Sequence, residues 1–268
     1  MKAEIEADTK KELADWLTQF VTPKRNELID KILAMRTRHI TAVLENIFQP
    51  HNASAVLRSC DIFGIQDVHI IEDAYEYTVN PEVAMGASRW LTLHRYGHPE
   101  PLPAPGTIGM RQMMEERKKI SLGTQACLPQ LKQAGYTIVA TSLRPGAVLL
   151  NDLPVDRPLA LCFGSEETGL SDMAHDLADV YMTIPMFGFT QSFNISVSAA
   201  LTFQTLIHKL HQSTVNWQLT PEEKYEVRLR WLINSATKGD ALVRQFLRDR
   251  GQPIPDEFMP ESDTEQDG

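Results

Sequence analysis

Three short polar clusters interrupt apolar stretches of the sequence and carry side chains suited to binding and proton transfer. The first is 47-IFQPHNASAVLRSCDIFG-64, in which six positions separate Asn52 from Arg58. The planar guanidinium of an arginine can grip a phosphate group with two parallel hydrogen bonds. A surface ion pair between Arg58 and Asp61, worth little energy, is the alternative interpretation.

The second cluster, 161-LCFGSEETGLSDMA-174, places a glycine on each side of a carboxylate. Gly164 and Gly169 flank Glu166, and glycine allows the backbone to approach a ligand closely. A tight turn with a solvated carboxylate would use the same residues. The Lys-Ser/Thr pair of a P-loop and the GxGxxG fingerprint are both missing, so neither a phosphate-binding loop nor a dinucleotide site is supported.

The third cluster, 183-TIPMFGFTQSFNISVSAALTF-203, holds Ser192 and Asn194 directly before a run with helical spacing. Both side chains suit the N-cap of that helix. A helix N-terminus with exposed polar side chains can also form the floor of a ligand site. Each cluster alone is weak support for a site, whereas three clusters at one edge of a sheet would make one.

The elements that must position these clusters alternate between apolar strands and helices. Pro50 is expected to end the first strand, Asn52 to cap the first core helix and Gly64 to end it. The pattern predicts an α/β fold with a mostly parallel sheet covered by helices on both faces. Ligands bind at the carboxyl edge of such sheets, where the clusters should converge. Strands are expected at 40–48, 67–72, 89–96, 136–141, 158–164 and 180–185, and helices at 52–63, 110–134, 171–178 and 194–211.

Helical stretches flank this alternation on both sides. Two amphipathic helices are expected within 9–36, with Pro23 opening the second, and two more near 220–236 and 239–250. The expected organisation is an N-terminal helical extension, a catalytic core with a Pro/Gly-rich surface excursion, a C-terminal helical extension and a disordered acidic tail. The corresponding ranges are 1–37, 38–211 with the excursion at about 97–121, 212–253 and 254–268.

Composition narrows the classes of protein. The 268 residues are 43% hydrophobic and carry a net charge of −9, which warns against nucleic acid unless positive charge is gathered locally. The three cysteines share no CxxC spacing, and neither a signal peptide nor a membrane-spanning run is legible. His208 and His211 lack a third metal ligand. We therefore expect a cytoplasmic protein with reduced thiols, no metal and no membrane partner.

Together the three clusters resemble the signature motifs of the SpoU branch of the SPOUT methyltransferases. N-x-x-x-x-x-R matches Asn52 to Arg58, and G-x-E-x-x-G matches Gly164 to Gly169. The third motif, I-P-M…S-x-N-x-S-x-[AS], matches Ile184-Pro185-Met186 and then Ser192-Phe193-Asn194-Ile195-Ser196. The resemblance covers roughly residues 38–211. The segments VLENIFQPHN and GASRW are further similar to the tRNA (guanosine-18) 2′-O-ribose methylases.

This resemblance implies a C-terminal trefoil knot, S-adenosylmethionine as cofactor, a homodimer with sites near the subunit interface, and methylation of a ribose 2′-hydroxyl of tRNA at guanosine 18. Methylation of ribosomal RNA is the alternative within the family, and a non-catalytic RNA-binding dimer is the alternative outside it. The implied catalytic residues are Asn52, Arg58, Glu166, Ser192 and Asn194. The implied cofactor-binding residues are Thr141, Gly164, Ile184, Met186 and Phe193.

The flanking helices of the relatives contact RNA, so the basic residues of these helices are candidates here. Counterion release on phosphate binding would supply the affinity. The net acidity and about twenty additional residues in the 97–121 excursion depart from the relatives' pattern. The candidate RNA-binding residues are Lys24, Arg25, Arg36, Arg38, Arg228, Arg230, Arg244 and Arg248.

Overall fold

The computed structural model describes residues 5–74, 81–97, 109–166, 168–190 and 192–259. The chain divides into two compact units. One unit is Arg36–Gln218, and the other joins Met1–Met35 to Leu219–Gly268. The first contains all three polar clusters and is called the core unit below. The second contains the flanking helices and is called the helical unit.

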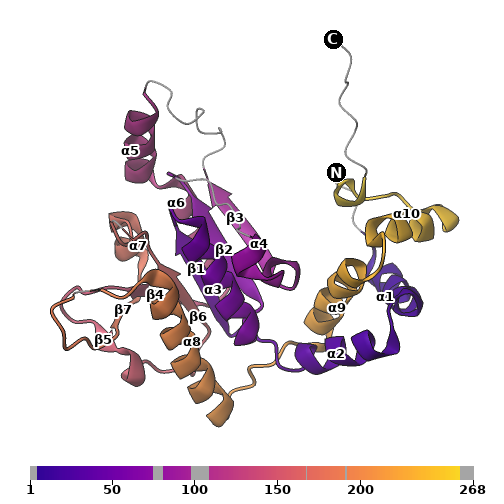
Figure 1. The fold of residues 1–268 in the computed structure, drawn as a ribbon, viewed down its shortest axis with the longest axis horizontal. Helices are drawn as coiled ribbons and strands as arrows, with labels where there is room; N and C mark the ends of the chain where they lie inside the picture. The colour runs from indigo at the N-terminus through magenta and orange to yellow at the C-terminus, as the bar shows by residue number, and fades with distance from the viewer. Residues whose placement is uncertain (1–4, 75–80, 98–108, 167, 191, 260–268) are drawn as a thin grey trace. The chain divides into compact units, whose positions relative to one another are not determined.

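A seven-stranded sheet forms the centre of the core unit (Figure 1), with the strand order β3-β2-β1-β6-β4-β7-β5. Every pairing between these strands is parallel. The predicted parallel sheet is therefore confirmed. The strands are β1 Ile40–Glu45, β2 Asp67–Glu72, β3 Thr92–Gly97, β4 Thr137–Thr141, β5 Val148–Leu149, β6 Leu159–Phe163 and β7 Val180–Thr183.

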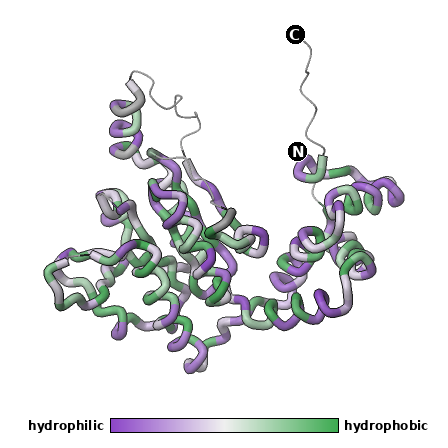
Figure 2. The backbone as a smooth tube through the Cα atoms, in the orientation of Figure 1, coloured by the Kyte–Doolittle hydropathy of each residue, from purple (hydrophilic) through white to green (hydrophobic). Residues whose placement is uncertain are grey.

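Helices cover both faces of this sheet. Alternate residues of a strand point to opposite faces, and β1 shows this directly: Leu44 packs with Phe203 on one face, whereas Val43 packs with Leu128 on the other. The face of Leu44 is covered by α3 and α8, which lie side by side (Figure 1), and the other face by α6 and α7. Figure 2 shows hydrophobic residues along the strands of this sheet and on the helices that cover it. The helices of this unit are α3 Pro50–Ile62, α4 Pro81–Ala84, α5 Met110–Ile120, α6 Leu122–Gln133, α7 Asp172–Leu177 and α8 Ile195–Gln212, with 3-10 turns at Ala87–Arg89 and Leu150–Asp152.

Two expectations about element boundaries near the clusters are wrong. Helix α3 begins at Pro50, with Gln49 at the N-cap, so Asn52 lies inside the first turn and does not cap it. Proline is well suited to the first helical position because its missing N–H has no intrahelical partner there. The expected single helix over 110–134 is two helices, because Ser121 between them has a left-handed φ of 51°. The short strand β5 and the 3-10 turn at Ala87–Arg89 were not predicted.

The described residues of the helical unit form four helices around an aromatic and aliphatic core. Trp231 and Phe246 are buried there, and the rings of Phe246 and Trp16 lie 5.3 Å apart. Helix α9 begins with a capping box in which Thr220 and Glu223 satisfy each other's backbone N–H groups. The helices are α1 Ala7–Leu17, α2 Pro23–Leu33, α9 Pro221–Ser235 and α10 Gly239–Asp249, with 3-10 turns at Thr18–Phe20 and Asp256–Phe258.

The start of the expected disordered tail needs correction. Asp256–Phe258 form a turn, and Arg244 Nη1 donates a hydrogen bond to the Phe258 carbonyl at 2.6 Å. Residues 260–268 of the expected tail, and 98–108 of the expected excursion, lie outside the described residues. Among the described helices, none has both the length and the apolar character needed to cross a membrane.

Candidate active site

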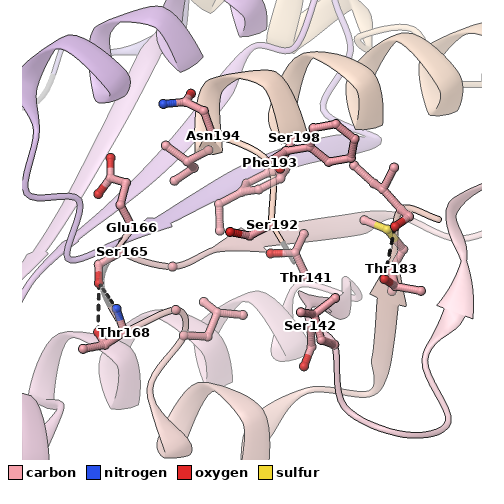
Figure 3. A pocket seen from close by; sticks show the side chains of 18 of the residues that line it. Thr141, Ser142, Ser165, Glu166, Thr168, Thr183, Ser192, Phe193, Asn194 and Ser198 are labelled. Atoms are coloured by element: carbon pink, nitrogen blue, oxygen red, sulfur yellow. Dashed lines mark hydrogen bonds between the residues drawn. The ribbon is translucent and has the colours of Figure 1, made fainter. Parts of the chain in front are cut away.

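A cavity of ≈ 780 Å³ opens at the carboxyl edge of the sheet. Its walls come from the loops that follow β1, β4, β6 and β7, four strands at the middle of the sheet. Figure 3 shows Thr141, Glu166, Ser192 and Asn194 around this space. The three polar clusters, which are far apart in the sequence, therefore meet where parallel α/β sheets bind ligands.

Asn52 is the residue that joins the three clusters. Its Nδ2 donates to Glu166 Oε1 at 2.6 Å, and its Oδ1 accepts from Asn194 Nδ2 at 3.0 Å. Its position inside the first turn of α3 buries this side chain and directs the amide toward the loops after β6 and β7. Nδ2 also donates to Gln49 Oε1 at 3.1 Å. The amide thus uses its donors and its acceptor to hold both neighbouring loops.

Asn194 has a second role as the N-cap of α8. Its Oδ1 accepts from the backbone N–H of Ser196 at 2.9 Å and from the Ser196 hydroxyl at 2.6 Å. The side chain therefore satisfies the helix N-terminus and contacts Asn52 at the same time. Both interpretations of this residue from the sequence, a helix cap and a site residue, are compatible with this arrangement.

The loop after β6 is a tight hairpin that presents Glu166 at its tip. Ser165 and Gly169 exchange two backbone hydrogen bonds of 3.1 and 2.9 Å, and the hydroxyls of Ser165 and Thr168 lie 2.8 Å apart. A Cβ atom on Gly164 would lie 2.1 Å from the carbonyl carbon of Gly169. Any larger residue at 164 would open the hairpin, so this glycine is needed for the loop itself.

The rest of the cavity wall is mixed in character. All five residues expected to bind cofactor line it, and the described residues of the third cluster, Ser192 and Asn194, do so too. The Thr141 hydroxyl donates to the Cys162 carbonyl at 2.8 Å, so its oxygen remains available as an acceptor. The wall thus combines apolar side chains with hydroxyl and amide groups.

Gln49 and His175 also line the cavity, and the sequence analysis did not select them. Gln49 follows the end of a strand, a position that could have indicated it. Burial, and then the positive charge of Arg144, lower the pKa of His175, so its ring is neutral at pH 7. No signal in the sequence separates this histidine from an ordinary helical residue.

Arg58 does not join the other motif residues. Its side chain is exposed on α3, and it is absent from the cavity wall. The alternative interpretation, an ion pair with Asp61, is wrong, because Asp61 pairs with Arg36. Within the described residues of this one chain, Arg58 makes neither an ion pair nor a side-chain hydrogen bond.

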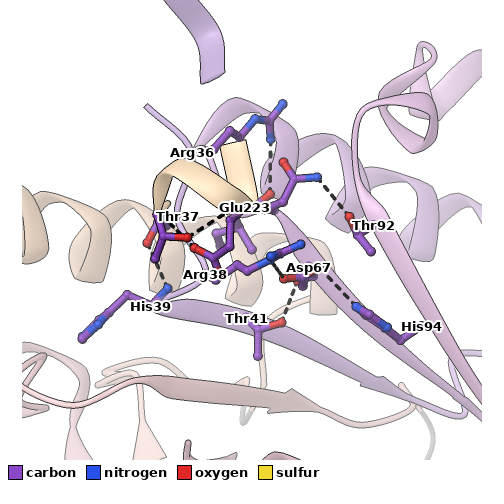
Figure 4. Close-up of polar contacts among 12 residues, drawn as sticks. Arg36, Thr37, Arg38, His39, Thr41, Asp67, Thr92, His94 and Glu223 are labelled. Atoms are coloured by element: carbon purple, nitrogen blue, oxygen red, sulfur yellow. Dashed lines mark hydrogen bonds and ion pairs between the residues drawn. The ribbon is translucent and has the colours of Figure 1, made fainter. Parts of the chain in front are cut away.

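The eight candidate RNA-binding residues fall into two groups. Arg36 is 1% exposed, pairs with Asp61 and donates to the Ile65 carbonyl, so a surface role for it is wrong (Figure 4). Arg38 is half-buried and its Nε lies 2.6 Å from Asp67 Oδ2. Arg228 pairs with Asp30 at 3.0 Å, and Arg244 is held by the Phe258 carbonyl. The remaining four are exposed: Lys24, Arg25, Arg230 and Arg248.

The buried thiols of the core unit do not form a second reactive centre. The three cysteines are free and buried, and burial raises the pKa values of Cys60 and Cys162 far above the usual range and that of Cys127 to about 12. Their thiols stay protonated and unreactive at neutral pH. Within the described ranges, no group of three or more His, Cys, Asp or Glu side chains is arranged to hold a metal ion.

Comparisons with known proteins identify a family whose profile matches the region of the chain that contains this site. The profile of the SpoU rRNA Methylase family matches residues 39–103 and 111–204. A tRNA (guanosine(18)-2′-O)-methyltransferase from Borreliella burgdorferi is 38% identical over 80% of this chain and 87% of that protein. An enzyme of the same name from Thermus thermophilus is 31% identical over 79% of this chain and 97% of that protein.

Two solved structures share the fold. The A. aeolicus TrmH/SpoU tRNA modifying enzyme superposes with a TM-score of 0.63 and 22% identity, covering 79% of this chain and 96% of that one. An AdoMet-bound rRNA methyltransferase from Sinorhizobium meliloti gives a TM-score of 0.51 and 18% identity, covering 71% of this chain and 61% of that one.

Proposed function

Because the chain belongs to the SpoU rRNA methylase family, we propose that it is an S-adenosylmethionine-dependent methyltransferase acting on a ribose 2′-hydroxyl of tRNA, at guanosine 18. One observation carries this assignment. Relatives named for that reaction are 31–38% identical over about four-fifths of the chain. The residues that the family profile matches, 39–103 and 111–204, contain the Asn52–Glu166–Asn194 cluster. A non-catalytic RNA-binding dimer would have no need to retain that cluster.

The chemistry of the cavity fits S-adenosylmethionine. A cavity of ≈ 780 Å³ is large enough for a ligand of this size, which needs an apolar wall together with a few fixed polar groups. Thr141 offers an acceptor, the tight hairpin at Gly164 brings backbone to the wall, and Glu166 supplies the negative charge that suits a sulfonium. We propose Thr141, Gly164, Ile184, Met186 and Phe193 as the residues that hold it.

When bound, the cofactor supplies an electrophilic methyl group. The protein must then orient the ribose hydroxyl and assist the loss of its proton. Asn52 fixes the relative position of Glu166 and Asn194. The second carboxylate oxygen of Glu166 makes no hydrogen bond with a described residue, and together with Ser192 it would face the incoming ribose.

For Arg58 we propose a phosphate-binding role in RNA recognition. A guanidinium resists deprotonation, so it is a poor general base. Its exposure on α3, outside the cavity wall, supports contact with the RNA backbone. The exposed cations of the helical unit, Lys24, Arg25, Arg230 and Arg248, would add further phosphate contacts. Local positive charge of this kind would offset the net charge of −9.

We further propose a homodimer. Helix α8 begins beside the cavity and exposes Val197 and Leu201, which lie one turn apart on the same face. Phe193 at the start of that helix is 42% exposed. A second copy could cover this apolar face next to the cavity. Light scattering should then give about twice the mass of one chain, and a fully active monomer would contradict the proposal.

The trefoil knot implied by the family is also a proposal. Strand β7 lies beyond β4, on the side of β6 that is away from β1. Helix α8 follows β7 directly, yet it packs against α3, which follows β1. The chain must therefore run back past the ends of β4 and β6, as threading through their loops would require.

The decisive test uses labelled S-adenosylmethionine with three RNAs: a tRNA, the same tRNA carrying a 2′-deoxyribose at guanosine 18, and ribosomal RNA. We expect label only in the first. Label in ribosomal RNA would favour the alternative substrate, for which the family description is the supporting observation. Label in the deoxy tRNA would place the reaction on another nucleotide, and no label in any RNA would contradict the proposed activity.

A further inference from the structure

Glu45 is a buried carboxylate at the carboxyl end of β1, and it does not line the cavity. Only 2% of its surface is exposed. Three donors converge on it. Its Oε1 accepts from the Thr124 hydroxyl at 2.5 Å and from the Ser171 hydroxyl at 2.7 Å, and its Oε2 accepts from the Ser171 backbone N–H at 2.7 Å. Charge-assisted hydrogen bonds of this length are the strong ones.

These donors come from two different elements. Thr124 lies in the first turn of α6, directly after the excursion, and Ser171 is the N-cap of α7. Ser171 also accepts from the Ala174 N–H at 3.1 Å, so the helix start and the carboxylate are linked through one side chain. Glu45 therefore connects the end of the central strand with the beginnings of two helices on one face of the sheet.

The consequence for the site lies just before Ser171. The preceding residues, 163–166 and 168–170, line the cavity and include the hairpin that presents Glu166. One end of this loop continues from β6, in the middle of the sheet. The other end is held at Ser171, and the side chain that holds it there belongs to Glu45. The orientation of the Glu166 carboxylate toward Asn52 depends on both ends.

We propose that Glu45 is a positioning residue for methyl transfer: it fixes the exit of the 164–170 loop and thereby the Glu166–Asn52 contact. This inference rests on the proposed methyltransferase function. A glutamine is a poor replacement despite its equal size, because its NH₂ group would face a donor where a carboxylate oxygen now accepts. Supporting groups that hold reactive residues in place are needed for productive geometry.

The test compares Glu45→Gln with Glu72→Gln. Glu72 ends the neighbouring strand, but its carboxylate pairs with the exposed Arg95, at 2.9 and 3.0 Å. We expect kcat of Glu45→Gln to fall by about tenfold or more, with KM for tRNA changed by less than about twofold. Amide hydrogen exchange should rise over 164–171. The Glu72→Gln variant should match the parent in all three measurements.

A second pair separates positioning from plain stability. Thr124→Val removes the donor from α6, and Ser171→Ala removes the hydroxyl donor of the loop exit. Ser171→Ala should lower kcat and Thr124→Val should chiefly lower the melting temperature. Equal kcat losses in the two, or a folded Glu45→Gln with parental kcat and exchange, would overturn the proposal. If the parent methylated no RNA, that result would count against the proposed function, and increased exchange in Glu45→Gln would still show that Glu45 fixes the exit of this loop.

Discussion

Polar side chains cluster at both the amino and the carboxyl ends of the central strands, but the two clusters differ in their residue types and in how completely the groups are paired. At the amino edge, Arg38 and His94 both contact Asp67, Thr41 donates to the Asp67 carbonyl, and Arg36 pairs nearby with Asp61 (Figure 4). The carboxyl edge instead holds amide and carboxylate side chains around an open cavity (Figure 3).

The difference lies in how completely the groups are paired. Burial alone would raise the pKa of Asp67, but the hydrogen bond from His94 and the charge of Arg38 outweigh it and leave the pKa below its usual value. Such a cluster favours the folded state and offers nothing to a ligand. In the cavity, Asn52 is fully engaged, whereas Glu166 keeps one carboxylate oxygen without a described partner. A ligand site needs polar groups that are held in place but still have a hydrogen-bonding atom available for the ligand.

The largest effect is expected on methyl transfer, and it is tested by replacing one buried amide side chain at each end of the sheet. Asn52→Ala should lower methyl transfer by about 10²-fold or more, because both neighbouring loops lose their common anchor. Gln66→Ala, at the amino edge, removes hydrogen bonds to the Trp90 carbonyl and the Thr92 hydroxyl. That variant should lose thermal stability and keep its kcat. The comparison would fail if Gln66→Ala lost activity as strongly as Asn52→Ala while remaining folded.

The next effect is the pH dependence of stability. Burial, and then the charge of His94, lower the pKa of His69 from 6.5 to about 4. Between those values the unfolded chain binds a proton that the folded chain does not, so the free energy of unfolding falls as pH drops from 6.5 toward 4. The loss should reach about 2–3 kcal/mol. Above pH 6.5 this residue should give no slope.

Urea denaturation at pH 7.0 and 4.5 tests this expectation. His69→Gln should be less stable at pH 7.0, because the ring contacts with His94 and Tyr96 are lost, but its stability should change less between the two pH values. His175 is also buried and lies at the carboxyl end of the sheet, so His175→Gln measures how much of the pH dependence comes from that end. An unchanged pH slope in His69→Gln would show that the amino edge is not the source.

Features that depend on local sequence could be predicted, whereas contacts between residues far apart in the sequence could not. Strand β2 was predicted with its observed ends, and the three clusters were expected to meet, because both follow from local pattern and from the rule for parallel sheets. The burial of Arg36 was not predictable. Its partner Asp61 is 25 positions away, and nothing local distinguishes it from the exposed cations.

The two wrong helix boundaries have a similar cause. A single helix over 110–134 would pass through two weak helix formers, Ser121 and Gly123, and the chain turns at Ser121, where Gly123 packs closely against Asp73. A Cβ atom on Gly123 would lie 3.1 Å from Asp73 Oδ1. Asparagine favours the N-cap, which is why Asn52 was expected there, but the helix begins earlier and Asn52 lies within its first turn, where it contacts Glu166.

A smaller effect is expected from the amino-edge carboxylate itself. Asp67→Asn keeps the shape but removes the charge that pairs with Arg38 and His94. Because both partners are partly exposed, the loss should be about 1–2 kcal/mol. A depressed pKa means that the contribution of Asp67 is present above its unfolded pKa near 4 and is lost as pH falls further. Parent and variant should therefore converge in urea denaturation as the pH falls through the lowered pKa of the folded-state Asp67. A constant difference at every pH would contradict this origin.

The smallest effect is expected on tRNA binding by the helical unit. There, exposed cations without an ion pair to a described residue can be compared with a cation that is held in an ion pair. Lys24 and Arg248 are exposed and make no ion pair with a described residue, whereas Arg228 is 20% exposed and pairs with Asp30. If RNA binds through open cations, Lys24→Gln with Arg248→Gln should weaken tRNA binding about threefold to tenfold at low salt. The slope of log affinity against log salt should become shallower by about 1 to 2.

Arg228→Gln should leave that slope unchanged and lower the melting temperature, because it breaks an internal contact. Cofactor affinity, measured by calorimetry, should be unaffected in both variants, since none of the three replaced residues lines the cavity. A double variant with the parental slope would mean that tRNA does not contact these helices, and the exposed Arg58 of the core unit would then be the next cation to replace.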